Sequence, residues 1–243
     1  MNRQAQSVVL LLVGGAVLRA SLTDLYLRYV KQGLRPFLIA AGVLLVATAV
    51  ATLWFELRRS GGSSAHEHEL DDGHGHAVGG PKVAWLLILP VLGLLLVAPP
   101  ALGSYAANRA GTALQQSSED FAPLPPGDPV RISVLDYASR AVFDQGKSLG
   151  ERRLQLSGFL IAGPDGAWYL TRMILSCCAA DARPIKVALS GQLPDGLVAD
   201  GWLRITGTYV AKSVKDTVNG ERIPYIEVIE AESIPAPAEQ YES

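Results

Sequence analysis

The stretch Pro36–Phe55 reads PFLIAAGVLLVATAVATLWF, twenty residues without a charged side chain. Val83–Leu102 is a second uncharged run of the same length. An α-helix rises about 1.5 Å per residue, so about 20 apolar residues span a hydrocarbon core roughly 30 Å thick. Both runs therefore predict transmembrane helices. Because no such run follows Leu102, the chain is expected to be a membrane anchor followed by a soluble domain.

A shorter apolar stretch, Ser7–Leu18, precedes these runs, and Arg19 and Asp24 follow it. Its length is compatible with a signal-peptide core, an interfacial helix or a short span. A signal peptide is disfavoured because no small-x-small cleavage site follows. We therefore expect Ser7–Leu22 to be a first span, which makes three transmembrane helices.

The sequence divides into four parts by composition. Residues 1–116 are the expected transmembrane region, with a polar, Gly-rich loop at 56–82. Residues 117–129 are a linker with four prolines, 130–235 a soluble β domain, and 236–243 a tail. Transporters build midplane sites from repeated helical halves, and no such repeat is visible here. A role in transport therefore implies a larger partner.

The basic residues near the membrane decide the expected orientation. Four such residues would face inward with either placement of the N-terminus, so the counts alone tie. Arg58, Arg59 and Lys82 flank both ends of the 56–82 loop, which favours an N-terminus inside. The soluble domain of this multi-pass cell-membrane protein is then extracytoplasmic.

Short strands are predicted beyond the linker. Leu154, Leu156 and Gly158 alternate with polar residues, a pattern typical of half-buried strands. The expected strands are Arg153–Ile161, Ala167–Leu175, Ile185–Leu189, Trp202–Val210 and Tyr225–Ile234, after a lead-in strand at Val130–Leu135 and a helix at Tyr137–Gln145. Glycines in the middle of two of the five permit sharp bends. The fold class is therefore membrane-anchored α + β with a small closed β-barrel of the OB type.

The two cysteines of the chain, Cys177 and Cys178, are neighbours just after a predicted strand. Two thiolates with the nearby carboxylate of Asp181 would suit zinc or another divalent transition metal, although the set lacks a ligand for a closed tetrahedral site. Adjacent side chains in a strand point to opposite faces, so one metal could bind both only if the backbone turns there. The alternatives are a structural pair, one buried and one exposed, and a strained vicinal disulfide.

All four histidines lie in one eleven-residue window: His66, His68, His74 and His76. Imidazole suits zinc, copper or nickel, and the glycines of this loop would let it close around an ion. Its affinity should be modest because ordering the loop opposes binding. The alternative is a solvated low-complexity loop.

Two functional classes are disfavoured. Net charge is −2, and no clustered Lys and Arg would displace counterions from a nucleic acid. Trp168, Tyr169, Trp202 and Tyr209 could stack bases, but strand aromatics are more often core. The soluble domain contains no histidine, no Gly-x-Ser-x-Gly elbow and no phosphate-binding loop. We therefore expect no enzyme, no catalytic residue and no nucleic-acid partner.

Several segments together resemble the YcgQ family of bacterial membrane proteins, described as subunits of a two-component permease. The segments are the layout of apolar runs, Pro99-Pro100-Ala-Leu-Gly, Arg172–Ala182 followed by Pro184, Gly201–Gly207, and Ile223-Pro-Tyr-Ile-Glu-Val-Ile-Glu-Ala. The Cys-Cys-Ala-Ala-Asp core is the most specific of them. The resemblance implies a multi-span permease partner of the YcgR type, and a link to zinc or other transition metals.

Two functions follow as expectations. In the first, the chain is an accessory subunit of a membrane permease, with Cys177, Cys178 and Asp181 as contact or ligand residues. In the second, it is a membrane-tethered module that binds a peptide or envelope partner without a transport role.

Overall fold

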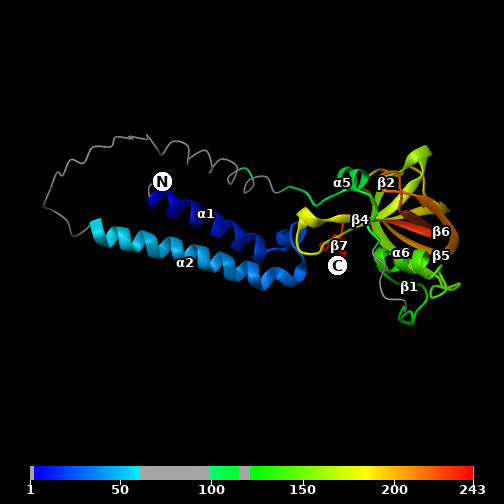
Figure 1. Cartoon of the computed structure of the whole chain (residues 1–243), viewed down its shortest axis with the longest axis horizontal. Helices are drawn as coiled ribbons and strands as arrows, with labels where there is room; N and C mark the ends of the chain where they lie inside the picture. The colour runs from blue at the N-terminus through cyan, green and yellow to red at the C-terminus, as the bar shows by residue number, and fades with distance from the viewer. Residues whose placement is uncertain (1–2, 61–92, 94–98, 115–120, 243) are drawn as a thin grey trace. The chain divides into compact units, whose positions relative to one another are not determined.

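The computed structural model describes residues 3–60, 93, 99–114 and 121–242 (Figure 1). The chain forms two compact units. The first is Met1–Tyr26 with Gln32–Pro100, and the second is Leu27–Lys31 with Ala101–Ser243. The second unit thus contains a five-residue segment from near the N-terminus, together with residues that composition assigned to the membrane region, the linker and the tail.

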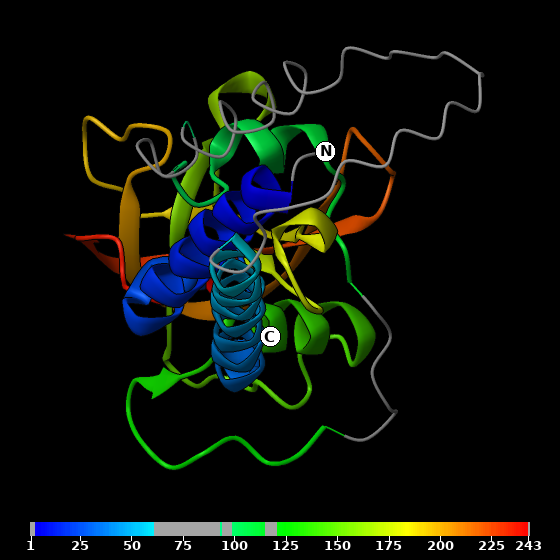
Figure 2. The same ribbon diagram turned by 90° about the vertical axis from the view of Figure 1, so that its left-hand side faces the viewer.

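The first unit contains a helical hairpin. Helix α1 (Arg3–Leu22) lies alongside α2 (Arg35–Ser60), as Figures 1 and 2 both show. The helices approach closely at Gly42, where an added Cβ would lie 2.8 Å from Cγ of Leu18. Small residues allow such close approach between apolar helices. The hydroxyls of Ser7 and Thr52 are 2.7 Å apart and form a hydrogen bond across the hairpin.

Among the described residues, one helix is long and apolar enough to cross a membrane: Gln32–Arg58, which includes the predicted span Pro36–Phe55. Length and composition alone identify it. The predicted first span is helical, but its apolar part, Gln6–Leu22, is shorter. Most of the third, Val83–Leu102, lies outside the described residues. The described part of the chain therefore provides one candidate span where the sequence predicted three.

The second unit is built on a closed five-stranded barrel (Figure 1). Its strands are β2 (Leu154–Ala162), β3 (Trp168–Ile174), β4 (Arg183–Gly191), β5 (Trp202–Lys215) and β6 (Arg222–Ile234). They pair in the order β2-β5-β6-β4-β3, and β3 returns to β2. All these pairs are antiparallel except β4 with β6. The predicted five-stranded closed barrel is confirmed.

Two short strands extend this sheet. Strand β1 (Val130–Arg131) runs parallel to the start of β2, and β7 (Tyr241–Glu242) runs parallel to the end of β3. The predicted lead-in strand is shorter than expected. The backbone becomes helical at Val134, because Ser133 caps α6 (Val134–Phe143) by accepting a hydrogen bond from Asp136 N at 2.9 Å.

The barrel has an apolar interior that α6 closes at one side. Side chains such as Leu156, Leu170 and Ile205 are at most 1 % exposed, and Tyr137 of α6 packs among them. The Tyr137 hydroxyl donates to the carbonyl of Tyr225 on β6. Burial of aliphatic side chains of this size stabilises the fold by about 1.5–3 kcal/mol each.

A second apolar cluster covers the outer face of β2 and β3. Phe159, Tyr169 and Met173 lie in it, with Trp202 from β5. Ala107 of the short helix α5 (Ser104–Arg109) is fully buried against this cluster. This face, which lies outside the barrel, is therefore occupied by the chain itself.

Glycine allows the strands to bend where the sequence predicted. An added Cβ at Gly158 would lie 2.6 Å from the carbonyl oxygen of Thr171, and one at Gly207 would lie 2.4 Å from that of Glu227. The register of β5 with β6 shifts between Thr206 and Gly207. The close strand crossings of a small barrel thus require hydrogen at these positions.

Candidate metal-binding site

The cysteine pair lies in the loop that joins β3 to β4. The chain leaves β3 after Ile174, and residues Ala179–Asp181 form one turn of 3-10 helix, η4. That turn lets neighbouring side chains face one point. One ligand atom each of Cys177, Cys178 and Asp181 lies within 4.8 Å of the others. The backbone turn that the metal-binding interpretation required is therefore present.

The Asp181 carboxylate organises this loop. Its Oδ1 accepts a hydrogen bond from Ser176 N at 2.9 Å. Its Oδ2 accepts from Cys177 N at 2.8 Å and from the Cys177 Sγ–H at 2.9 Å, with Cys178 N at 3.4 Å. Asp181 therefore has a structural role in this loop whether or not a metal binds.

These hydrogen bonds shift the acid–base properties of both side chains. The hydrogen bond from the Cys177 thiol, supported by those from backbone amides, lowers the pKa of Asp181 to about 2. The same thiol–carboxylate hydrogen bond, with a second involving Cys178, raises the pKa of Cys177 to about 11. The Cys177 thiol is therefore protonated near neutral pH, and a metal must displace this proton in order to bind.

Both cysteines are free thiols, and neither lies in the barrel interior. Cys177 is exposed and Cys178 is half-buried. Of the three interpretations, the structure does not contain the vicinal disulfide, and a cysteine buried inside the barrel is also wrong. The two side chains remain accessible to a ligand.

The segment Leu27–Lys31 forms a backbone clamp on this loop. Val30 and Cys178 form an antiparallel β-bridge. Lys31 N donates to the carbonyl of Cys177 at 3.1 Å, and Ala179 N donates to the carbonyl of Tyr29 at 2.7 Å. The loop is thus held on one side by residues from between α1 and α2, a long-range pairing that no local pattern in the sequence indicates.

Tyr241 and Glu242 support the same region and were missed by the sequence analysis, which placed them in the tail. The Glu242 carboxylate accepts from the backbone N–H groups of Val134 and Leu135 at 3.0 and 2.9 Å, and so caps α6. It also pairs with Arg172 Nε at 3.4 Å. Leu175 N donates to the carbonyl of Glu242 at 3.0 Å. No motif spacing could have found these residues.

A tetrahedral zinc ion fits this arrangement with small side-chain movements. With Zn–S bonds of about 2.3 Å, the ligand atoms of such a site lie about 3.8 Å apart. The three ligand atoms lie within 4.8 Å of one another, a wider separation than such a site needs. Rotation of the side chains about χ1 can close this difference. Three ligands leave one position open, as in zinc sites that exchange a ligand.

The other candidate residues do not join this cluster in the described part of the chain. His66, His68, His74 and His76 lie outside the described residues. Of the four aromatic residues considered for base stacking, Tyr169 and Trp202 lie in the outer apolar cluster, whereas Trp168 and Tyr209 are half-buried against the barrel core.

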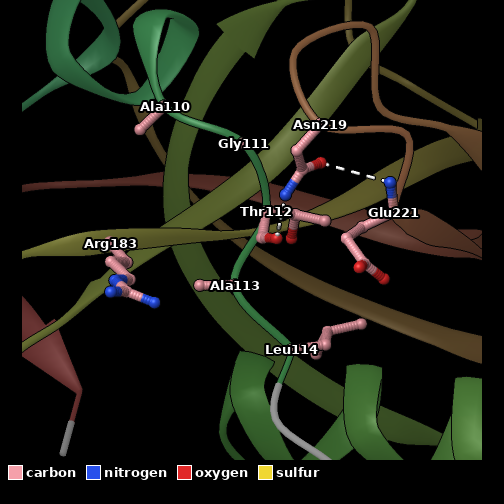
Figure 3. A pocket seen from close by; sticks show the side chains of 8 residues that line it. All are labelled: Ala110, Gly111, Thr112, Ala113, Leu114, Arg183, Asn219 and Glu221. Atoms are coloured by element: carbon pink, nitrogen blue, oxygen red, sulfur yellow. Dashed lines mark hydrogen bonds between the residues drawn. The ribbon is translucent and has the colours of Figure 1, made fainter.

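A polar pocket of about 340 Å³ lies elsewhere on the barrel unit (Figure 3). The Gly111–Leu114 segment runs through it in Figure 3, with Arg183 on one side and Asn219 and Glu221 on the other. The Asn219 amide donates to the carbonyl of Thr112 at 3.0 Å, so its polar groups are partly used in holding the chain. This pocket brings together no metal-ligand set.

Comparison with known protein families bears on the part of the chain that carries the cluster. Residues 142–242 match the DUF1980 C-terminal domain. The DUF1980 match includes β2 to β7 and the Cys177–Asp181 loop, whereas the helical hairpin and Leu27–Lys31 lie outside it. Comparisons with curated proteins and with solved structures give no match. The similarity to DUF1980 therefore supports a shared domain but names no activity and no permease.

Proposed function

We propose that this protein is a membrane-anchored accessory subunit of a permease that binds a divalent transition metal, zinc or a similar ion, at Cys177, Cys178 and Asp181. One observation carries the proposal: these three ligand atoms lie within 4.8 Å in an accessible loop. Soft thiolates select metals of this class over magnesium or calcium. The anchor would be multi-pass, with the apolar helix in Gln32–Arg58 as one span.

The incomplete ligand set favours transient binding. A closed site of four protein ligands would hold zinc as a structural ion, whereas an open position can be filled by water or by a group from another protein. A metal held this way can be passed to a partner. The resemblance to YcgQ proteins suggests that the partner is a multi-span permease of the YcgR type, and that the metal is its cargo.

Two finer features belong to the same proposal. The strand order, with β4 parallel to β6 and the other barrel pairs antiparallel, supports an OB-type barrel. Three spans, with the barrel outside the cytoplasm, would place the site where external metal arrives. His66, His68, His74 and His76 would then gather cations on the opposite side of the membrane. A Gly61–Gly80 peptide tests that role, since no heat change on titration with millimolar zinc would contradict it.

The metal site is tested by zinc titration of the full-length protein in detergent against a chromophoric chelator. We expect wild type to compete for one zinc ion, with affinity rising with pH because the thiols must lose protons. The double variant Cys177→Ser/Cys178→Ser should bind zinc more than about 100-fold more weakly, a larger loss than removing a residue that only hydrogen-bonds to a metal ligand would cause. Ser176→Ala, in the same loop, is the matched control. Equal binding by wild type and the double variant would refute the site.

The permease role is tested by purification from a mild detergent extract. We expect a multi-span protein to co-purify in stoichiometric amount. We also expect the double cysteine variant to lose metal-dependent growth at normal protein levels. A soluble or envelope protein in its place would favour the second candidate, a tethered interaction module. The structural role of Asp181 favours that candidate, because its carboxylate is already engaged by hydrogen bonds within the loop.

A further inference from the structure

Two parts of the chain that adjoin apolar segments meet at one hydroxyl group. Leu27–Lys31 lies between α1 and α2, and Leu102 ends the apolar run Val83–Leu102. The Tyr241 hydroxyl donates to the carbonyl of Arg28 at 2.9 Å and accepts from Leu102 N at 2.9 Å. All three residues belong to the barrel unit.

We define the junction face of the barrel unit by four parts: Leu27–Lys31, Leu102–Arg109, Cys177–Asp181 and Tyr241. Hydrogen bonds connect all four of them, since Lys31 N donates to the carbonyl of Cys177 at 3.1 Å and Tyr241 contacts both Arg28 and Leu102. The Cys177–Asp181 loop is therefore on the same face as both chain connections.

The composition of this face matches a membrane–water interface. Arg28, Lys31 and Arg109 are basic, and Tyr29 and Tyr105 are aromatic. The Tyr105 side chain is 71 % exposed, and the Arg109 guanidinium lies over its ring at 4.4 Å. Aromatic and basic residues are enriched at the headgroup level, where their apolar parts meet lipid and their polar parts meet water.

Chain length limits how far this face can be from the bilayer. From Leu102 to Tyr105 the chain can reach about 10 Å. Leu27–Lys31 is bounded by Leu22, at the end of α1, and by Arg35, at the start of α2. If the apolar runs cross the membrane, both connections start from the same lipid surface.

We infer that the junction face lies against the headgroups of an anionic bilayer and that the Cys177–Asp181 loop is thereby held at the membrane surface. This inference rests on the membrane anchor in the proposed function. Clusters of Lys and Arg next to spans are attracted to anionic lipid, by about 1 kcal/mol per residue near the surface. A metal bound at the loop would be presented at the level where a permease opens.

Lipid-quenching fluorescence tests this placement on the full-length protein in vesicles. In the Cys177→Ser/Cys178→Ser background, single cysteines are introduced by Asn108→Cys on the junction face and Lys147→Cys away from it, and each is labelled with bimane. Both native side chains are exposed. Lys147 follows the far end of α6, whose first turn is capped by Glu242, so about 15 Å of helix separates the two ends.

Vesicles of phosphatidylcholine and phosphatidylglycerol carry a nitroxide on a fraction of the headgroups. We expect at least about twofold stronger quenching of the label at 108 than at 147, with the difference reduced when phosphatidylglycerol is omitted. Tyr105→Ala should also reduce quenching at 108, because it removes the exposed ring.

The outcomes separate this inference from the proposed function. Equal weak quenching at both positions, in a protein that floats with the vesicles, would overturn the junction-face placement and leave the anchor intact. A co-purified protein that shields position 108 from the lipid quencher would also overturn the placement against lipid and leave the anchor intact. A protein that does not float with vesicles would refute the anchor and this inference together.

Discussion

At the Cys177 thiol, the Asp181 carboxylate accepts the Sγ–H at 2.9 Å, and this hydrogen bond raises the pKa of Cys177 to about 11. We predict that Asp181→Asn increases alkylation of Cys177 by iodoacetamide at pH 8. A fall of the pKa to about 9 would raise the thiolate fraction about 100-fold, and the lower nucleophilicity of the weaker base reduces the gain to about tenfold.

The measurement uses a Cys178→Ser background so that one thiol reacts. In the Cys178→Ser protein with Asp181 intact, the alkylation rate of Cys177 should rise about tenfold per pH unit and level off only near pH 11, because the thiolate is the reacting species. Asp195→Asn, on a loop elsewhere, is the control and should leave the rate unchanged. A plateau near pH 9 with Asp181 intact would contradict the role of its carboxylate.

Tyr241 is a second residue whose side chain we expect to matter for stability, because its hydroxyl hydrogen-bonds to two backbone groups. Its side chain is 6 % exposed, and burial raises the pKa of Tyr241. Tyr241→Phe leaves Leu102 N and the carbonyl of Arg28 without this partner, so we predict a loss of about 1–3 kcal/mol in the free energy of unfolding. Urea denaturation followed by near-ultraviolet circular dichroism measures it. Tyr105→Phe, on an exposed ring, should change stability by less than about 0.5 kcal/mol.

Among the elements of the barrel unit, a buried ion pair connects β4 to the end of β5. Lys186 Nζ lies 2.9 Å from Asp216 Oδ2, and both side chains are at most 5 % exposed. Asp216 also accepts from Thr112 N at 2.8 Å, and Lys186 donates to the carbonyl of Ala110 at 2.9 Å. The pair therefore also holds the chain segment that runs from α5 over the barrel.

We predict that Asp216→Asn destabilises the barrel unit by about 3–5 kcal/mol, because it leaves the Lys186 ammonium buried without a counter-ion. The matched control is Asp128→Asn. Asp128 Oδ1 lies 2.8 Å from Arg153 Nε, a distance close to that of the Lys186–Asp216 pair, but both side chains are about half exposed or more. Its loss should lower stability far less than Asp216→Asn does, because solvent screens an exposed ion pair and leaves neither group buried without a partner. Similar urea midpoints for the two variants would contradict the importance of burial.

Local patterns in the sequence predict the elements of this fold better than their long-range pairings. Period-two alternation around Leu156 and the glycine at Gly158 identified strands and a closed barrel. The start of α6 was placed three residues too late, although its cap Ser133 is local; the second cap, Glu242, lies more than one hundred positions away and leaves no local signal. The Cys177–Asp181 cluster was found because its ligand types lie close in sequence. Its clamp by Leu27–Lys31 was missed, since a two-residue bridge leaves no periodic signal.

On the scale of the whole molecule, the barrel unit is completed by residues from near the N-terminus. Leu27–Lys31 supplies the carbonyl of Tyr29 to Ala179 N at 2.7 Å and the N–H of Lys31 to the carbonyl of Cys177 at 3.1 Å. By contrast, every residue of the apolar cluster inside the barrel follows Ala101 in the sequence. Folding of the barrel and ordering of its Cys177–Asp181 loop are therefore separable.

A chain that begins at Ala101 should accordingly fold into the barrel but hold the Cys177–Asp181 loop less firmly. We predict faster hydrogen exchange of the Ala179 amide in this fragment than in the full-length protein, by about fivefold or more for the loss of one backbone hydrogen bond of about 1 kcal/mol. The Leu170 amide, in the core of β3, is the internal control and should exchange at the same rate in both. Unchanged exchange at Ala179 would mean that Asp181 alone orders the loop. Faster exchange at both amides would mean instead that Leu27–Lys31 stabilises the entire barrel, which would make this segment part of the fold and not only a clamp on the candidate site.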